Sequence, residues 1–437
     1  MHKVLIANRG EIALRIQRSC RELGIQTVAA YAAVDSDLLH LKFADEIVCI
    51  SKSDYLCAES LVSAALTTGC DAVHPGYGFL SENAAFCRLV EDHGLTYIGP
   101  TSEQIAEMGN KILARCAFKA HDIRPVPGSE EEIDHLDDAE RLVNEIGYPV
   151  IVKAAFGGGG RGIRIVDNEA MLEGAFTAAK AEADAVFGDG TVYIEKFLDD
   201  ARHIEVQILG DGKGGAVHFG TRECSIQRRQ QKVIEEAPAP NISQARLDAL
   251  CEQAVAAVAT LQYRNAGTLE FLYQDGEFYF VEMNTRIQVE HPVTEAITGH
   301  DLLRLQVETA DGELPLTQEK IAFSGSAIEC RLNAEDDQYL PSPGVLTEVR
   351  FPGGAGVRVD SHLYAGYRVP HHFDSLIAKL IVWDQDRPGA LRKMQRALDE
   401  MSISGIETNK LKLQEIVADE KFQEGRVNTR FLDQLSG

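Results

Sequence analysis

The chain has 437 residues, of which 45% are hydrophobic and 25% are charged, and its formal net charge is −24. This length predicts about two to four domains, and the negative charge argues against nucleic acid or an anionic membrane as the main partner. The nine Cys lack CxxC spacing, which favours reduced thiols in a cytoplasmic protein over disulfides or a zinc site. No signal peptide and no membrane-spanning run are expected.

Short apolar runs alternate with helical patterns over the first hundred residues. Residues 3–7 (KVLIA) are the first expected strand, and a helix is expected from Glu11 to Leu23, closed by Gly24. The further expected strands are TVAAYAA, EIVCI, DAVHPG and TYIGP. This βαβ rhythm predicts an open parallel α/β sheet. The first strand-to-helix turn, residues 8–10, lacks GxGxxG, so dinucleotide binding is not expected there.

A loop with two glycines around Tyr77, HPGYGFLSEN, follows at residues 74–83. It is interpreted either as a purely structural loop or as an aromatic gate over a pocket. Residues 102–121 are then expected to form a helix and a connector.

A glycine-rich loop, FGGGGRG at residues 156–162, lies between two β-rich runs, PVIVKAA and IRIV. A strand follows this loop where a helix would follow a Rossmann fingerprint, and no Gly-Lys-Ser/Thr of a Walker loop occurs. Because glycine lets backbone N–H groups approach closely, the tip of such a hairpin suits phosphate. Lys153 on the entering strand could reach the same phosphate. The alternative is a mobile surface turn.

The run TLEFLYQDGEFYFVEMN, residues 268–284, predicts a β-hairpin. A two-residue turn, Asp275-Gly276, would pair Glu270 with Val281 and place Glu270 and Glu282 on opposite faces. We expect instead a three-residue loop that ends in a left-handed Gly276, so that Glu270 pairs with Phe280 and shares a face with Glu282 and Asn284. Two carboxylates and a carboxamide form an oxygen-only site suited to magnesium. A solvated strand face is the alternative, but aromatic neighbours on that face indicate burial, and buried carboxylates need a cation or donors.

Polar residues continue to alternate beyond this hairpin. In EMNTRIQVE the even positions are Glu282, Asn284, Arg286, Gln288 and Glu290, and the odd positions are largely apolar. An extended chain places all five polar groups on one face.

A basic run, Arg228, Arg229 and Lys232, precedes this hairpin in an otherwise acidic chain. It is either a solvated patch or a means of neutralising an anionic intermediate. Cys224 has no base placed beside it by the sequence and is interpreted as a packed thiol. Helices are expected over residues 241–261, 387–399 and 409–418, and the strands IECRL, GVLTEVRFP, GVRVD and IAKLIVW follow residue 323.

Seven of these segments together resemble the biotin carboxylase family of the ATP-grasp superfamily. They are ANRGEIALRI, HPGYGFLSEN, KAAFGGGGRG, CSIQRRQQKVIEEAP, EMNTRIQVEHPVTE, IECRLNAED and AGYRVPHHFDSLIAKL. The resemblance covers nearly the whole chain and implies an α/β and α+β architecture with the ATP-grasp fold. It implies an N-terminal parallel α/β domain (1–108), an ATP-grasp domain (109–322) with a mobile lid at about 125–197, and a β-rich C-terminal domain (323–437).

The resemblance also implies an activity, the ATP-dependent carboxylation of biotin on a biotin carboxyl carrier protein, with bicarbonate and through carboxyphosphate. The likeness is greatest to the separate biotin carboxylase subunit of bacterial acetyl-CoA carboxylase, which serves fatty acid biosynthesis. The chain ends after NTRFLDQL without a Met-Lys-Met biotinyl site, as expected for a free subunit. The implied partners are the carrier protein, carboxyltransferase subunits and a second copy of the chain, with a homodimer contact near Arg15, Arg18 and Glu22.

Individual residues match the family's site residues. For ATP they are Lys111, Lys153, Gly158, Gly159, Gly160, Glu195, Lys196, Phe197, Leu198, His203, Gln227 and Gln230. For two Mg²⁺ or Mn²⁺ ions they are Glu270, Glu282 and Asn284, for bicarbonate Lys232, Arg286, Gln288, Val289 and Glu290, and for biotin Tyr77 and Arg331. The implied catalytic set is Glu290, Arg331, Lys232 and Arg286. Glu290 is the base for bicarbonate, Arg331 stabilises the biotin enolate, and released phosphate is the second base.

Two positions depart from the family pattern. Gln230 in RRQQK stands where a histidine is usual and cannot transfer a proton, and Asn110 in MGNK stands where an aspartate is usual. Three functions remain open from the sequence. The first is a biotin carboxylase, serving acetyl-CoA or another acyl-CoA, pyruvate or urea. The second is a different ATP-grasp ligase that joins a carboxylate to an amine, and the third is a non-catalytic, nucleotide-responsive subunit.

Overall fold

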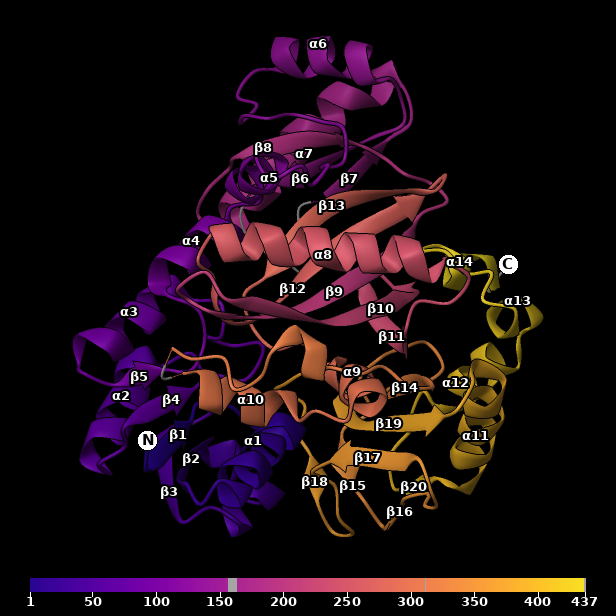
Figure 1. Cartoon of the computed structure of the whole chain (residues 1–437). Helices are drawn as coiled ribbons and strands as arrows, with labels where there is room; N and C mark the ends of the chain where they lie inside the picture. Colours follow the sequence, from indigo (N-terminus) through magenta and orange to yellow (C-terminus); the bar gives the residue numbers. More distant parts are fainter. Residues whose placement is uncertain (156–162, 311, 436–437) are drawn as a thin grey trace.

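The computed structural model describes residues 1–155, 163–310 and 312–435. The first hundred residues form a five-stranded parallel sheet of order β3-β2-β1-β4-β5, at the lower left of Figure 1. The strands are β1 Lys3–Ile6, β2 Gln26–Ala32, β3 Glu46–Ser51, β4 Ala72–His74 and β5 Thr96–Tyr97, and the helices are α1 Gly10–Glu22, α2 Ala58–Thr67 and α3 Ala84–Asp92. The inner strand β1 is buried on both faces, as crossover helices require. The predicted open parallel sheet is therefore confirmed.

The expected helix over residues 102–121 is two helices, α4 Ser102–Gly109 and α5 Lys111–Lys119. Asn110 separates them, because its ψ of 108° is extended and its side-chain oxygen accepts hydrogen bonds from the first N–H groups of α5. Asn is a favoured N-cap residue for this reason. The break places Lys111 at the start of α5, where its Nζ lies 2.8 Å from Glu282.

A separate three-stranded sheet of order β7-β6-β8 stands at the top of Figure 1. Its elements are α6 Leu136–Ile146, β6 Val150–Ala154, β7 Ile163–Val166, α7 Glu169–Phe187 and β8 Val192–Lys196, and their apolar side chains form a cluster of their own. The pairing of Lys153 with Ile163 confirms the predicted hairpin. The loop at its tip, with the predicted ATP contacts Gly158, Gly159 and Gly160, lies outside the described residues.

An eight-stranded antiparallel sheet of order β13-β12-β9-β10-β11-β14-β19-β17 forms the centre of the molecule. Its strands are β9 Arg202–Asp211, β10 Ala216–Arg228, β11 Gln231–Ala237, β12 Arg264–Gln274, β13 Glu277–Asn284, β14 Ser326–Asn333, β17 Val357–Ser361 and β19 Leu376–Asp384. Helix α8 Gln244–Thr260 lies across β9, β10 and β12 (Figure 1). Because β14 pairs with β11, the sheet continues past residue 323, where a new domain was expected to begin.

The turn of the β12–β13 hairpin differs from the prediction. Gln274 pairs with Glu277, so the loop contains two residues, Asp275 and Gly276, and not three. Both have positive φ, 54° and 82°, as a type I′ turn requires. The predicted pairing of Glu270 with Phe280 is therefore wrong.

A β-bulge in β13 nevertheless places Glu270 and Glu282 on the same face of the hairpin, as predicted. Phe271 pairs with Phe280 and Glu270 pairs with Glu282, so Val281 is an extra residue in β13. Such a bulge re-aims the side chains that follow it. Glu270 and Glu282 therefore lie directly opposite each other, and the carboxylate pair predicted for this hairpin is present.

The polar alternation after residue 284 does not continue as a strand. β13 ends at Asn284, and residues 285–290 form bends and a turn that lead into α9 His291–Thr298. Pro292 lies in the first turn of α9, where proline is well tolerated. The prediction of one extended polar face is therefore wrong, although the same polar residues line the cavity described below.

The remaining elements complete the C-terminal part of the fold. They are α10 Leu302–Thr309, β15 Gly344–Val345, β16 Glu348–Arg350, β18 Arg368–Val369, α11 Arg387–Glu400, β20 Ser402–Ser404, α12 Lys410–Ala418, α13 Glu420–Gln423 and α14 Phe431–Leu435. Helices α8, α11 and α12 confirm the three expected from the sequence. Within the described ranges, no helix combines the length and the apolar character needed to cross a membrane.

Candidate active site

One cavity of about 1690 Å³ is lined by residues from α1, from the loop that follows β4, from the three-stranded sheet, from the eight-stranded sheet and from α14. Every described residue of the predicted site lines it: Tyr77, Lys111, Lys153, Glu195, Lys196, Phe197, Leu198, His203, Gln227, Gln230, Lys232, Glu270, Glu282, Asn284, Arg286, Gln288, Val289, Glu290 and Arg331. The fold therefore brings together residues that lie far apart in the chain. The geometry below shows what this set of groups can do.

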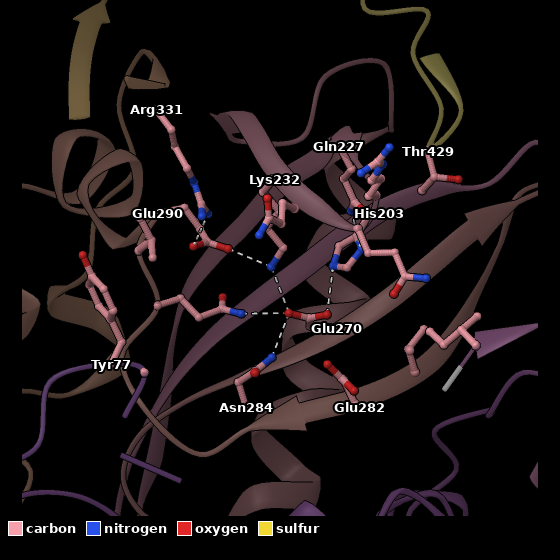
Figure 2. Close-up of a pocket in the computed structure, with 18 of the residues that line it drawn as sticks. Tyr77, His203, Gln227, Lys232, Glu270, Glu282, Asn284, Glu290, Arg331 and Thr429 are labelled. Carbon is pink, nitrogen blue, oxygen red and sulfur yellow. Dashed lines mark hydrogen bonds and ion pairs between the residues drawn. The ribbon is translucent and has the colours of Figure 1, made fainter. Parts of the chain in front are cut away.

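Lys232, from β11, makes ion pairs with three carboxylates, of which Figure 2 shows Glu290 and Glu270. Its Nζ lies 2.8 Å from Glu290 and 2.9 Å from Glu270, and it also contacts Glu205. Burial opposes the charge of this lysine, but the three carboxylates raise the pKa of Lys232 well above its usual value. The site therefore contains a buried ammonium group that an incoming anion can approach.

Glu290, in the turn before α9, is held by two cations. Its Oε1 accepts a hydrogen bond from Lys232 at 2.8 Å, and its Oε2 accepts one from Arg331 Nη2 at 2.9 Å. Burial favours the neutral acid, as does the neighbouring Glu205, but Lys232, Arg331 and Arg222 together lower the pKa of Glu290 to about 2. Arg331 also donates from Nε to Glu235 at 2.5 Å. Glu290 is thus an ionised carboxylate whose basicity rises when these cations turn to another anion.

The two carboxylates of the β12–β13 hairpin face the same cavity (Figure 2). Oε1 of Glu270 accepts hydrogen bonds from Lys232 at 2.9 Å and from the amides of Asn284 and Gln288 at 2.8 Å each. Burial opposes ionisation, but Lys232 and then His203 hold the pKa of Glu270 well below its usual range. Glu282, on the neighbouring strand, lies 2.8 Å from the Nζ of Lys111. Carboxylate and amide oxygens of this kind fit a hard divalent cation.

His203 and Gln227 lie together beside the carboxylates, as their shared predicted role requires (Figure 2). The ring Nδ1 of His203 lies 3.0 Å from the Gln227 amide, and its Nε2 lies 3.1 Å from Glu270 and 3.3 Å from Glu205. Burial lowers the pKa of the imidazole, but Glu270 and Glu205 raise it to about 9. His203 therefore adds positive charge to this wall of the cavity.

Two fully buried residues behind this wall, Arg222 and Glu205, were not predicted from the sequence. Arg222 donates to Glu205 at 3.0 Å and to the side-chain oxygen of Gln288 at 2.6 Å, and its other donors reach Gln207, Thr268 and Thr294. Because Arg222 holds the Gln288 oxygen, the amide nitrogen of Gln288 points to Glu270. Strand periodicity could have found Glu205, since it lies two residues after His203 and so shares its face.

The other end of the cavity contains the predicted nucleotide residues. Lys153 lies 2.5 Å from Glu195, and Arg115 also contacts Glu195. Three residues near the C-terminus line this cavity and were also missed, namely Thr429, Arg430 and Asp433. Asn428, beside them, donates to Asp200 at 2.6 Å, just after the predicted ATP contacts at residues 195–198. This contact joins residues 228 positions apart, which no local pattern indicates.

Tyr77, in the loop that follows β4, is linked through Glu11 and Lys379 to the segment that contains Val289 and Glu290. Its hydroxyl donates to Glu11, and Glu11 lies 3.0 Å from Lys379. Lys379 also donates to the carbonyl of Val289 at 2.9 Å. Tyr77, Gly78, Phe79 and Glu82 of the loop 74–83 line the cavity, and an aromatic gate at this loop stays a prediction. Gln230 lies at the exposed β10–β11 turn with φ of 66°.

Replacing Lys232 with Met is expected to destabilise the protein by about 3–5 kcal/mol at pH 7, because it leaves buried carboxylates without their cation. In the wild type the folded-state pKa values of these carboxylates are depressed. In the variant we expect them to rise above the unfolded value of about 4.3. The difference from wild type should therefore shrink as pH falls through that value. Urea unfolding at pH 7 and pH 4 measures it, with Lys412→Met as the surface control, since Lys412 pairs with the exposed Glu415. A difference that does not change with pH contradicts this account.

Comparison with known proteins agrees with this geometry. Residues 1–105 match the biotin carboxylase N-terminal domain, residues 110–318 match the ATP-binding domain of the carbamoyl-phosphate synthase L chain, and residues 329–434 match the biotin carboxylase C-terminal domain.

Whole-chain relatives are also found. The biotin carboxylase of Pseudomonas aeruginosa is 50% identical over 444 residues, which span 100% of this chain and 99% of that protein. A pyruvate carboxylase subunit of Methanothermobacter thermautotrophicus is 46% identical, over 99% and 89% of the two chains. The biotin carboxylase domain dimer of Hydrogenobacter thermophilus 2-oxoglutarate carboxylase, solved with MgADP, ADP and bicarbonate, superposes with a TM-score of 0.97 at 46% identity, over 99% of this chain and 97% of that one.

Proposed function

The chain belongs to the biotin carboxylase family, and from that premise we propose that it carboxylates biotin on a biotin carboxyl carrier protein, using ATP and bicarbonate. The observation that carries the proposal is the contact chain Lys232–Glu290–Arg331 on the wall of the large cavity. It provides a cation for bicarbonate, a base for its proton and a guanidinium for the second anion of the reaction. The other ATP-grasp ligases considered from the sequence need no such set.

In the first step, bicarbonate attacks the γ-phosphorus of ATP, and the bond to ADP breaks. Lys232, Arg286, Gln288 and the backbone of Val289 would hold bicarbonate, and Glu290 accepts its proton as carboxyphosphate forms. With its pKa at about 2, Glu290 is a weak base while Lys232 and Arg331 bind it. Bicarbonate draws Lys232 toward itself, so binding of the substrate makes Glu290 more basic.

Glu270, Glu282 and Asn284 would hold Mg²⁺ or Mn²⁺. Their fit rests on the oxygen donors of the facing pair Glu270 and Glu282 and on the low pKa of Glu270, which keeps it ionised. Divalent cations bound there supply positive charge against the ATP phosphates. Lys111 and Lys153 bind the phosphates as well, residues 195–198 take the adenine, and His203 and Gln227 contact the ribose side. Gln230 contacts the nucleotide or its phosphates through amide hydrogen bonds. The same role for Gly158, Gly159 and Gly160 stays a prediction.

In the second step, carboxyphosphate gives CO₂ and phosphate. The phosphate removes the ureido N–H proton of biotin, and that nitrogen attacks CO₂. Arg331 stabilises the negative charge that develops on the ureido oxygen, and Tyr77 lies beside the entering biotin. Both residues line the cavity.

The finer assignments belong to the same proposal. The domains are residues 1–108, 109–322 and 323–437, of which the last two share the eight-stranded sheet. Residues from about 125 to 197 form a lid that closes over ATP, and two copies form a homodimer near Arg15, Arg18 and Glu22. The final acceptor is acetyl-CoA, so the chain works with carboxyltransferase subunits in the cytoplasm. The support is the slightly higher identity to a separate biotin carboxylase than to the pyruvate carboxylase subunit, 50% against 46%.

The first experiment measures ATP cleavage by the wild-type protein with magnesium, with and without bicarbonate and with and without free biotin. The proposal expects bicarbonate-dependent cleavage that biotin stimulates. ATP cleavage that instead needs an amine and another carboxylate identifies a different ATP-grasp ligase. Nucleotide binding without turnover identifies a non-catalytic subunit, and Gln230→His is then the variant to examine.

The acceptor is tested separately, by combining the protein with the biotin carrier and carboxyltransferase of acetyl-CoA carboxylase or with those of a pyruvate carboxylase. Labelled bicarbonate should enter malonyl-CoA in the first mixture and not oxaloacetate in the second. The reverse result rejects acetyl-CoA while leaving biotin carboxylation intact.

A further inference from the structure

Glu329, on β14, is a buried acid that the mechanism above does not use. Its side chain is 0% exposed, and neither of its carboxyl oxygens has a hydrogen-bond partner among the described residues. A carboxylate ion placed there loses its water without gaining donors, which is costly. Burial raises the pKa of Glu329 well above its usual value; Lys379 opposes this shift and Glu235 adds to it. Glu329 is therefore a neutral acid with one O–H to donate.

Glu235, on β11, is placed to accept that hydrogen bond. It pairs directly with Glu329 in the antiparallel ladder, and such opposite residues have Cβ atoms about 4.5–5.5 Å apart on one face. Glu235 is also fully buried; its Oε1 accepts from Arg331, and its Oε2 has no partner among the described residues. Glu329 thus supplies a hydrogen-bond donor and Glu235 supplies an acceptor. One proton shared between them avoids two negative charges at close range.

The charged neighbours of this pair are already engaged with other groups. Arg331, two residues along β14, binds Glu235 and Glu290. Lys379, on β19, binds Glu11 at 3.0 Å and the carbonyl of Val289 at 2.9 Å. The other titratable groups nearby are Tyr77, which donates to Glu11, and His291 on α9, where burial and then Lys379 hold the imidazole pKa well below its usual value. Within the described part of the chain, both cations therefore direct their hydrogen bonds to groups other than Glu329.

We propose that Glu235 and Glu329 are positioning residues that share one proton and so set the net negative charge behind Arg331. With the proton present, one negative charge faces the guanidinium through Glu235. Without it, two negative charges lie behind Arg331 and offset the positive charge that biotin needs. The consequence for biotin rests on the proposed function, whereas the shared proton does not.

The shared proton is tested by infrared difference spectroscopy of the wild type against Glu329→Gln. Gln has the size of the neutral acid and keeps a donor, and thermal unfolding checks that the fold is retained. The wild type should show the C=O stretch of a protonated buried carboxyl, and the variant should lack it. The matched control is Glu236→Gln: Glu236 is the next residue of β11 and accepts hydrogen bonds from Arg387 at 2.6 and 3.0 Å. It should remove no such band. If Glu329→Gln removes none either, the shared proton is rejected.

The role toward Arg331 is tested by the pH profile of kcat/KM for free biotin in ATP cleavage with magnesium and bicarbonate. In the wild type this value should fall at alkaline pH, as the pair loses its proton. The amide introduced by Glu329→Gln cannot become negative, so in that variant the fall should move up by about one pH unit or more. A purely structural role lowers the rate equally at every pH, and an unshifted profile rejects the role. A wild type without biotin-dependent cleavage rejects the proposed function, and the infrared result still decides the proton.

Discussion

Replacing Glu290 with Gln is expected to lower bicarbonate-dependent ATP cleavage by about 10²- to 10⁴-fold, the usual contribution of a positioned base. Gln keeps the size of the side chain and accepts a hydrogen bond, but it cannot take the proton of bicarbonate. Both cations that bind Glu290 remain, at Lys232 and Arg331. The loss should therefore appear in kcat more than in the binding of ATP, whose predicted contacts lie elsewhere in the cavity. Steady-state rates and nucleotide titration measure the two effects.

Glu295→Gln is the matched control for this prediction. Glu295 lies in the next helix, α9, and is buried and bound by Arg15 at 2.8 Å and by Arg358 at 2.6 Å, but it does not line the cavity. Its replacement should alter stability and leave turnover near that of the wild type. Equal losses from both variants would mean that any buried ion pair near α9 supports activity, and Glu290 would lose its assignment as the base.

The carboxylate pair of the site shows how far the sequence leads. The hairpin itself, and the shared face of Glu270 and Glu282, were predicted from alternating residues and a three-residue loop that ends in Gly276. The turn was assigned one residue too many, because a β-bulge at Val281 and a three-residue loop both bring these carboxylates to one face. Local pattern cannot separate these two routes, since a bulge leaves no signature in residue type.

Contacts between distant segments were the part that the sequence did not predict. Arg222 fixes the amide of Gln288 across 66 positions, and the pairing of β11 with β14 carries the sheet past the expected start of a domain. That pairing also places Glu235 against Glu329. Strand order and cross-strand partners depend on the whole fold. The sequence patterns predicted the burial and charge of each segment by itself, and not which segments become neighbours. The resemblance to a known family supplied the positions of the site residues but not these supporting contacts.

Replacing Arg331 with Met is expected to separate the two half-steps of the reaction. Without the guanidinium, the negative charge on the ureido oxygen of biotin loses its stabilising donor, and biotin-stimulated turnover should fall by about 10²- to 10³-fold. Bicarbonate-dependent ATP cleavage without biotin should persist, because the loss of Arg331 removes one cation from Glu290 and makes this base stronger. The variant therefore differs from Glu290→Gln, which is expected to lose both activities.

Arg331→Lys distinguishes charge from geometry at the same position. Lysine keeps the positive charge but lacks the planar fork that lets Arg331 bind Glu235 and Glu290 together. If the fork matters, Lys should restore little of the biotin-dependent rate over Met; if charge alone suffices, Lys should restore most of it. A parallel fall of both activities in Arg331→Met would contradict the assignment, since it would place Arg331 in the ATP step with Glu290. The ratio of biotin-stimulated to unstimulated ATP cleavage is therefore the decisive measurement, because a general loss of folded enzyme leaves that ratio unchanged.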